Sequence, residues 1–254
     1  MGPDRDHLKN SKEIEIMVTQ PMWTLASCVK RPSSTIKSPY VADICIDNEP
    51  VLAHAPSLGV SGLLIPGKDI LVSKMKPANK CAYKIEAVRD GDIWVGINPI
   101  RPNHLSKEWL LSGLLLQNVK DVKSEVKITS DDITSRIDHI VIHNDDSETM
   151  VEVKSVPLSK DRVAYFPDGY KKKKTDTVSI RANKHLTHLI HHKKSGGNSC
   201  LIFVIQREDV DEFEPHDDEF TKLYNEAISV GVNILCCVCK VDLSGIALLK
   251  TFNK

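Results

Sequence analysis

Short apolar runs separated by turn-forming residues fill the first hundred positions of the chain. Five runs predict strands, at residues 22–29, 40–47, 69–73, 83–88 and 93–97. Clusters of proline, glycine, asparagine and aspartate lie between them, and these residues favour tight turns. Several short strands at close spacing are typical of a small barrel or meander. The first part of the chain is therefore predicted to be a small β-barrel.

The second part combines helical periodicity with longer apolar runs. Apolar residues recur every three or four positions in residues 104–117, 181–194 and 220–228, which predicts three helices. Asn103 is the expected N-cap of the first helix, and Gly231 is the expected end of the third. Strands are predicted at residues 136–143, 149–156, 200–205 and 233–241, the first two as a hairpin. This order predicts an α/β layer around a mixed sheet.

Composition indicates the number of domains and the compartment. The chain has 254 residues, of which 41% are hydrophobic, enough for two small domains with cores of their own. We predict a disordered tail at residues 1–13, a barrel domain at 14–99 and a second domain at 100–254. Seven cysteines without a framework spacing indicate reduced thiols, and no apolar run approaches the roughly 18 residues of a membrane span. These features predict an intracellular protein without a membrane partner, most simply a cytoplasmic one, with the nucleus or an organelle left open.

Three charged residues on the predicted hairpin carry the candidate chemistry. Glu152 and Lys154 lie two positions apart on one strand, so their side chains share one face, while Val151 and Val153 point to the other. The hairpin turn brings Asp138 on the first strand near Glu152 on the second. Two carboxylates and a lysine suit Mg²⁺-assisted phosphodiester hydrolysis. Mg²⁺ takes one or two carboxylates and keeps several waters, one of which becomes the nucleophile.

A surface ion pair is the alternative interpretation of this pattern. Glu-x-Lys is frequent in lysine-rich chains, and a second copy occurs at Glu125-Val126-Lys127. An exposed cross-strand pair contributes about 0–1 kcal/mol and needs no function. The pattern alone leaves both interpretations open. Strand context and the preceding Asp138 favour the copy at Glu152 and Lys154 for catalysis.

Four short segments occur in a characteristic order. They are Ser135-Arg136-Ile137-Asp138, Val151-Glu152-Val153-Lys154-Ser155-Val156, Tyr165-Phe166-Pro167-Asp168 and Lys184-His185-Leu186. Together they resemble the sugar fermentation stimulation protein family, over residues 22–250 and most specifically in the second half. The resemblance implies a two-domain α+β protein. An N-terminal OB-like β-barrel would precede an α/β mixed-sheet, restriction-endonuclease-like domain of the PD-(D/E)xK nuclease type.

The family pattern assigns roles to individual residues. On that pattern Asp138 and Glu152 hold a Mg²⁺ or Mn²⁺ ion, Lys154 is the catalytic lysine, and Glu125 has a supporting role. Asn183 stands where the family has glutamine, so its amide is a second supporting candidate with a shorter reach. The expected activity is that of a metal-dependent nuclease acting on DNA or RNA.

Local charge predicts the nucleic-acid surface, because the chain as a whole is neutral, with 34 basic and 34 acidic residues. Residues 160–194 contain ten Lys or Arg and three Asp, an excess of seven positive charges that would attract a phosphate backbone. The expected nucleic-acid contacts are Arg136, Lys171, Lys172, Lys173, Lys174, Arg181 and Lys184. A solvated loop or a nuclear-targeting tract is the alternative for the four consecutive lysines.

Two other functions remain open from the sequence. A non-catalytic DNA-binding regulator linked to sugar metabolism would keep the fold and the basic surface without cleavage. An interaction protein of carbohydrate metabolism is suggested by the family name, but no sugar-site pattern supports it. The complete set of Asp138, Glu152 and Lys154 favours catalysis, whereas Asn183 and the altered family loop at residues 54–59 favour a binding protein. The sequence leaves DNA versus RNA and monomer versus homodimer undecided.

Overall fold

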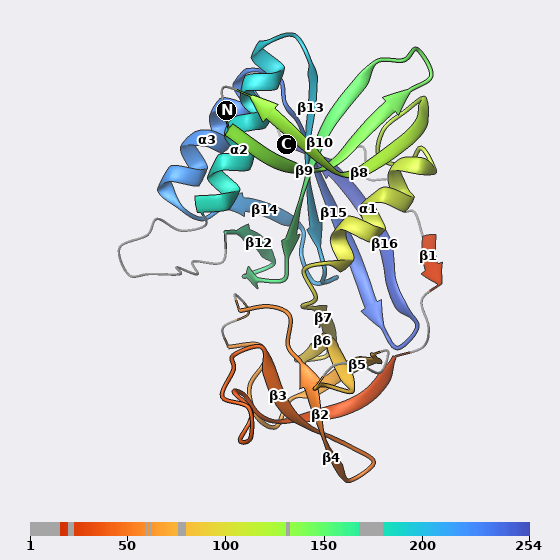
Figure 1. The fold of residues 1–254 in the computed structure, drawn as a ribbon, viewed down its shortest axis with the longest axis vertical. Coiled ribbons are helices and arrows are strands. Elements are labelled where there is room, and N and C mark those ends of the chain that lie inside the picture. The colour runs from red at the N-terminus through yellow and green to blue at the C-terminus, as the bar shows by residue number, and fades with distance from the viewer. Residues whose placement is uncertain are drawn as a thin grey trace, which may run out of the picture.

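A computed structural model describes residues 16–19, 23–58, 60, 62–75, 80–130, 133–167 and 180–254 of the chain. A small barrel and a larger, helix-covered sheet are joined end to end (Figure 1). The predicted two-domain α+β architecture is confirmed. The predicted tail at residues 1–13 lies outside the described residues. Every described helix is too short or too polar to cross a membrane.

The N-terminal domain is a closed five-stranded barrel with one additional strand. Its strands are β2 (Thr24–Lys30), β3 (Val41–Ile46), β4 (Glu49–His54), β5 (Asp69–Lys74), β6 (Tyr83–Asp90) and β7 (Ile93–Gly96). They pair in the order β4-β3-β2-β5-β6-β7, and pairing between β4 and β6 closes the barrel. All five predicted strands are present. The prediction lacks β4, because Glu49 and Pro50 continue a run of turn-forming residues. The turn itself is only Asp47 and Asn48, both with positive φ, as suits a two-residue hairpin.

The C-terminal domain is built on a seven-stranded mixed sheet. In spatial order its strands are β1 (Ile16–Thr19), β16 (Gly245–Asn253), β15 (Asn233–Asp242), β13 (Asn198–Ile205), β10 (Glu148–Val156), β9 (Ile133–His143) and β8 (Val119–Ser130). Strands β10, β13 and β15 run parallel at its centre, and β9 and β10 form the predicted hairpin. The prediction lacks β1, β8 and β16. In β8, lysine, aspartate and glutamate interrupt the apolar residues, which weakens its signal. Because β1 pairs with β16, residues 16–19 belong to this sheet and not to the barrel.

Three helices cover the two faces of the sheet (Figure 1). Helices α2 (Ile180–Lys194) and α3 (Asp218–Ser229) pack on one face, and α1 (Arg101–Leu111) packs on the other. The three predicted helices are present, with two corrections to α1. Helix α1 is preceded by Ile100 as its N-cap, so Asn103 lies inside the first turn. It ends at Leu111, well before residue 117, because Gly113 follows in a left-handed conformation.

Buried polar contacts join the two domains. The backbone N–H of Gly96, at the end of β7, donates to the carbonyl of Gln206 at 2.8 Å. Glu86 of β6, 1% exposed, accepts hydrogen bonds from Arg101 at 2.8 and 2.7 Å. Removing one partner of such a buried ion pair typically costs about 3–5 kcal/mol. The pair therefore holds the first turn of α1 against the barrel.

Gly96→Ala is expected to destabilise this junction by about 1–3 kcal/mol, the usual cost of overpacking. A Cβ at position 96 would lie 2.7 Å from Oε1 and 2.9 Å from Cβ of Gln206, whose side chain is fully buried. Denaturant unfolding measures the change. Gln206→Gly removes all of the obstructing side-chain atoms, including Cβ, so adding Gly96→Ala to that variant should cause little further loss. Fully additive losses would show that the contact does not restrict position 96.

Candidate active site

The site lies where β9 and β10 separate. Their ladder ends with Val151 opposite His139, and continuing the same register would pair Glu152 with Asp138. Beyond this point the side chain of Asp138, in place of a backbone carbonyl of β9, is the hydrogen-bond acceptor for β10. Its Oδ2 accepts a hydrogen bond from the backbone N–H of Val153 at 2.8 Å. The carboxylate of Asp138 therefore lies at the edge of β10, one residue beyond Glu152.

The alternation of β10 directs Glu152 toward α2. Val153 packs in the core on the α1 side, as the sequence predicts, and Glu152 projects to the opposite side. Its Oε1 accepts hydrogen bonds from Nζ of Lys154 and pairs with Nδ1 of His185 on α2. Glu152 is 2% exposed, and its Oε2 is buried with no hydrogen-bond partner among the described residues. The carboxylate thus keeps one oxygen available for a ligand.

The two carboxylates have opposite pKa shifts. Burial raises the pKa of Asp138 to about 6, and the nearby charge of Glu152 adds to the rise. Burial would also raise the pKa of Glu152, but Lys154 and His185 together outweigh it and lower this pKa to about 2. Near neutral pH both groups are therefore ionised, with Lys154 and His185 against Glu152. A buried, charged pair with shifted pKa values is typical of a functional site.

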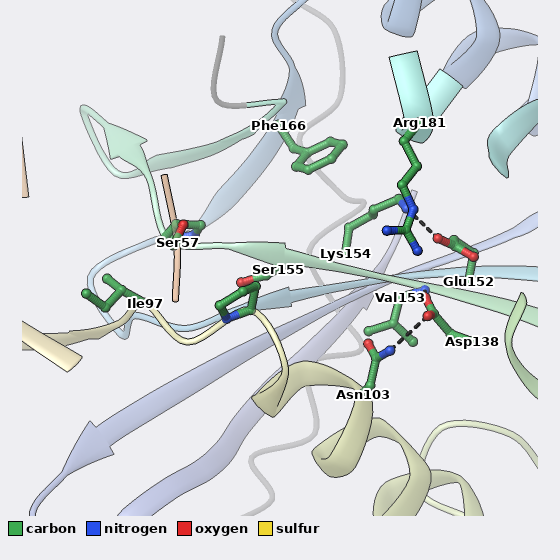
Figure 2. A pocket seen from close by; sticks show the side chains of 12 residues that line it. Ser57, Ile97, Asn103, Asp138, Glu152, Val153, Lys154, Ser155, Phe166 and Arg181 are labelled. Atoms are coloured by element: carbon green, nitrogen blue, oxygen red, sulfur yellow. Dashed lines mark hydrogen bonds and ion pairs between the residues drawn. The ribbon is translucent and has the colours of Figure 1, made fainter. Parts of the chain in front are cut away.

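Asn103 orients Asp138 from the other face of the sheet. Its Nδ2 donates to Oδ1 of Asp138 at 2.8 Å, so both oxygens of that carboxylate accept a hydrogen bond. In Figure 2 the two side chains face each other, while Lys154 extends toward Glu152. Asn103 is in the first turn of α1, which the buried pair of Arg101 with the barrel holds in place. The barrel thereby helps to position a residue of the site.

These groups line one cavity between the domains. The cavity volume is about 290 Å³. Both domains contribute to its wall, which consists of Ser57, Ile97, Pro99, Asn103, Asp138, Glu152, Val153, Lys154, Ser155, Pro157, Phe166 and Arg181. The structure therefore places the three predicted catalytic residues and Arg181 around a common opening (Figure 2).

The remaining predicted residues lie elsewhere. Glu125 forms an exposed ion pair with Arg136 at 3.6 Å, and neither residue lines the cavity. Lys184 is exposed on α2, one turn beyond Arg181. Asn183 is 6% exposed, and neither its amide oxygen nor its amide nitrogen has a hydrogen-bond partner among the described residues. It does not line the cavity either. Lys171, Lys172, Lys173 and Lys174 lie outside the described residues.

Sequence reasoning missed two residues that contact the carboxylates. Asn103 carries the signature of a helix cap, and nothing local relates it to Asp138, 35 positions away. His185 belongs to a segment that resembles the family, but four histidines on that helix favour a general basic surface. The useful signal was the spacing of His185 four residues after Arg181, which places both side chains on the same side of α2.

Comparisons with known proteins find relatives over most of the chain. The family described as "Sugar fermentation stimulation protein RE domain" matches residues 100–245. The sugar fermentation stimulation protein homolog of Microcystis aeruginosa is 33% identical over 216 residues, which cover 82% of this chain and 86% of that protein. The homolog of Desulforamulus reducens is 34% identical over 204 residues, 78% of this chain and 80% of that protein.

The fold is also found in a solved structure. "The structure of Pyrococcus Furiosus SfsA in complex with Ca2+" is similar with a TM-score of 0.76 and 21% identity, covering 95% of this chain and 96% of that chain. The likeness therefore extends over both domains. With the sequence relatives matching most of its length, the chain belongs to the sugar fermentation stimulation protein family.

Proposed function

We propose that the protein is a metal-dependent nuclease that hydrolyses phosphodiester bonds in DNA or RNA. The observation that carries the proposal is the grouping of Asp138, Glu152 and Lys154 around one cavity between the domains. A structural ion pair would explain Glu152 and Lys154, but it would not explain a second ionised carboxylate beside them. Two neighbouring carboxylates each disfavour the charged form of the other, and a bound cation would offset this repulsion.

The donor set fits Mg²⁺ or Mn²⁺. Oε2 of Glu152 is buried without a partner among the described residues, and Asp138 is ionised above about pH 6. No cluster of three His, Cys, Asp or Glu side chains suited to a metal occurs in the described part of the chain. Two carboxylates are nevertheless enough for Mg²⁺, which keeps several of its waters. The similar protein of Pyrococcus furiosus was solved in complex with Ca²⁺, another cation that prefers oxygen ligands.

The protein side chains would divide the work. A bound metal ion would acidify a water molecule and polarise the phosphate. Lys154 would orient the attacking water and offset negative charge in the transition state. Its contact with Glu152 holds the ammonium group at the cavity in advance. Arg181, which lines the same cavity from α2, would bind a phosphate oxygen.

Cleavage of end-labelled single- and double-stranded DNA and RNA with Mg²⁺ or Mn²⁺ tests the proposal. Wild type should cleave at least one substrate, and Glu152→Gln should not. Glu125→Gln is the matched control, because Glu125 belongs to the second Glu-x-Lys copy and lies outside the cavity. If wild type binds nucleic acid but cleaves none of these substrates with either metal, the non-catalytic DNA-binding function is the better conclusion.

Affinity is expected to come from a local positive field. Replacing Lys171, Lys172, Lys173 and Lys174 with glutamine should flatten the dependence of log affinity on log salt. Each lost phosphate contact changes the slope by about 0.9 on duplex or about 0.7 on a single strand. Binding titrations over a salt series measure this. Unchanged slopes would assign the four lysines to solvation or targeting and leave Arg181 and Lys184 as the candidate anchors.

A further inference from the structure

The reacting groups of the proposed nuclease lie inside the cavity. The side chains of Glu152 and Lys154 are only 2% and 12% exposed. A phosphate group must therefore enter the cavity to meet them. The opposite part of its wall comes from the barrel, through Ser57 and Ile97. With about 290 Å³ in total, the cavity is at the lower end of the range for small-molecule sites.

The recessed position of Glu152 and Lys154 disfavours an intact duplex. A paired nucleotide carries the second strand with it, and the stacked pair on each side adds further bulk. An unpaired nucleotide can instead separate from its neighbours and enter alone, as in enzymes that act on single strands or extrude one base. Buried hydrogen bonds hold the two domains together, including the bond from the backbone N–H of Gly96 to the carbonyl of Gln206. Opening the cavity for a duplex would break such contacts.

Phe166 is placed to receive the unpaired base. The residue is half-buried at the end of β12 (Val163–Phe166) and lines the cavity with Lys154 and Arg181 (Figure 2). Its ring packs edge-on against Phe220, with centroids 5.2 Å apart, and tilted against Phe203 at 5.8 Å. These core contacts fix the orientation of the ring, so little conformational freedom remains to be lost when a base stacks on it.

We infer that the cavity selects single-stranded nucleic acid by stacking one unpaired base on Phe166 while Arg181 binds an adjacent phosphate. The inference rests on the proposed function for the identity of the ligand, and it adds the strand preference and a specificity residue. Aromatic residues make up only 5% of the chain, which fits a single stacking position better than a continuous platform. A ring accepts any base on its face, so strand selectivity without strong sequence selectivity follows.

Binding measurements in EDTA test the inference separately from cleavage. Fluorescence anisotropy compares the binding of the full-length chain to a labelled oligothymidylate and to a labelled blunt-ended DNA duplex. Phe166→Leu should weaken binding of the single strand roughly 5- to 150-fold, the range for loss of one base–aromatic stack, and leave duplex binding unchanged. Phe166→Tyr should retain most of the affinity because it keeps the ring.

Tyr165→Leu is the matched control. Tyr165 is the neighbouring aromatic residue on β12, but its ring packs at a tilt against His216, with centroids 4.8 Å apart, and does not line the site cavity. Its replacement should leave single-strand binding unchanged. Because Phe166 also contacts the core, thermal melting must show that Phe166→Leu is folded at the assay temperature. If it is not, Phe166→Tyr and Phe166→Met replace it in the comparison.

An oligothymidylate with one abasic position provides a second, ligand-side test. Scanning the abasic position should reveal one site where wild type loses affinity, and the loss should disappear in Phe166→Leu, since the two changes remove the same contact. Equal effects of Phe166→Leu on single strand and duplex, no effect on either, or no binding of the single strand by wild type would overturn the inference. Metal-dependent cleavage of duplex with no effect of Phe166→Leu would overturn it and keep the nuclease. If a base stacks on Phe166 but wild type cleaves no substrate, the inference stands and the proposed nuclease function is overturned.

Discussion

Lys154→Met is expected to lower the rate of metal-dependent cleavage by roughly 10²- to 10⁴-fold and to change nucleic-acid affinity only a few-fold. The side chain of Lys154 is 12% exposed, and its ammonium group is held by Glu152, so it is poorly placed to attract a distant phosphate backbone. Its charge matters most when negative charge develops on the reacting phosphate. Methionine keeps most of the length of the side chain and removes that charge.

Single-turnover cleavage and equilibrium binding with Ca²⁺ in place of Mg²⁺ separate the two effects. Lys127→Met is the matched control, because Lys127 ends the second Glu-x-Lys copy and is exposed on β8. It should cleave like wild type. An affinity loss as large as the rate loss in Lys154→Met would identify Lys154 as a phosphate anchor and contradict its catalytic role.

The stability of the metal-free protein is expected to fall as the pH rises through about 6, because of Asp138. Its pKa in the folded protein is about 6, above the ordinary value of 3.8, chiefly because of burial and then because of Glu152. The folded state therefore holds this proton more tightly than the unfolded state does. The resulting stabilisation is complete below about pH 4 and lost above about pH 6, by up to about 3 kcal/mol. The ionised carboxylate of Asp138 therefore destabilises the metal-free folded state, and a bound cation would offset this destabilisation.

Denaturant unfolding of wild type and Asp138→Asn between about pH 4 and pH 7 measures this contribution as a difference in slope. The difference is needed because burial lowers the pKa of His139 to about 4, which makes stability fall in the opposite direction, toward low pH. His139 makes the same contribution in wild type and in Asp138→Asn, so it cancels in the difference. Parallel pH profiles would show that the carboxyl of Asp138 titrates normally.

Addition of Mg²⁺ or Mn²⁺ provides the matching ligand test. At about pH 7 and a metal concentration of about 100 times Kd, wild type should gain about 2.7 kcal/mol, and Asp138→Asn should gain much less. The gain in wild type should shrink as the pH falls below about 6, since protonated Asp138 cannot bind a cation. Equal gains in the two proteins would place the cation elsewhere.

Local sequence patterns predicted most of the strands and helices, as well as the face that carries the chemistry. Alternation along β10 alone places Glu152 and Lys154 together and sends Val153 into the core, because successive strand side chains point in opposite directions. Helical periodicity located α2 and α3 within a few residues. Two of the strands that the prediction lacks have a weak local signal. β4 begins with Glu49 and Pro50, and β8 is rich in charged residues.

The two copies of Glu-x-Lys show where local patterns stop being informative. Both lie on strands, at β8 and β10, and the sequence distinguishes them only by the preceding Asp138 and by family resemblance. The structure separates them by position in the sheet. β8 is an edge strand, where Glu125 pairs with Arg136 in solvent, whereas β10 is central and buried. On β10, burial acts to raise the pKa of Glu152, but Lys154 and His185 lie against it and lower that pKa to about 2. Both the burial and these contacts depend on which elements pack around β10.

The completed site was decided by tertiary structure. Asn103 reaches Asp138 from α1 across 35 positions, and His185 reaches Glu152 from α2 across 33. The barrel contributes Ser57 and Ile97 to the cavity wall. The sequence by itself determined which residues share a strand face, because that follows from backbone geometry over a few residues. Only the packing of two helices and a second domain around β10 determined which distant side chains surround the carboxylates, because such contacts depend on the positions of whole elements.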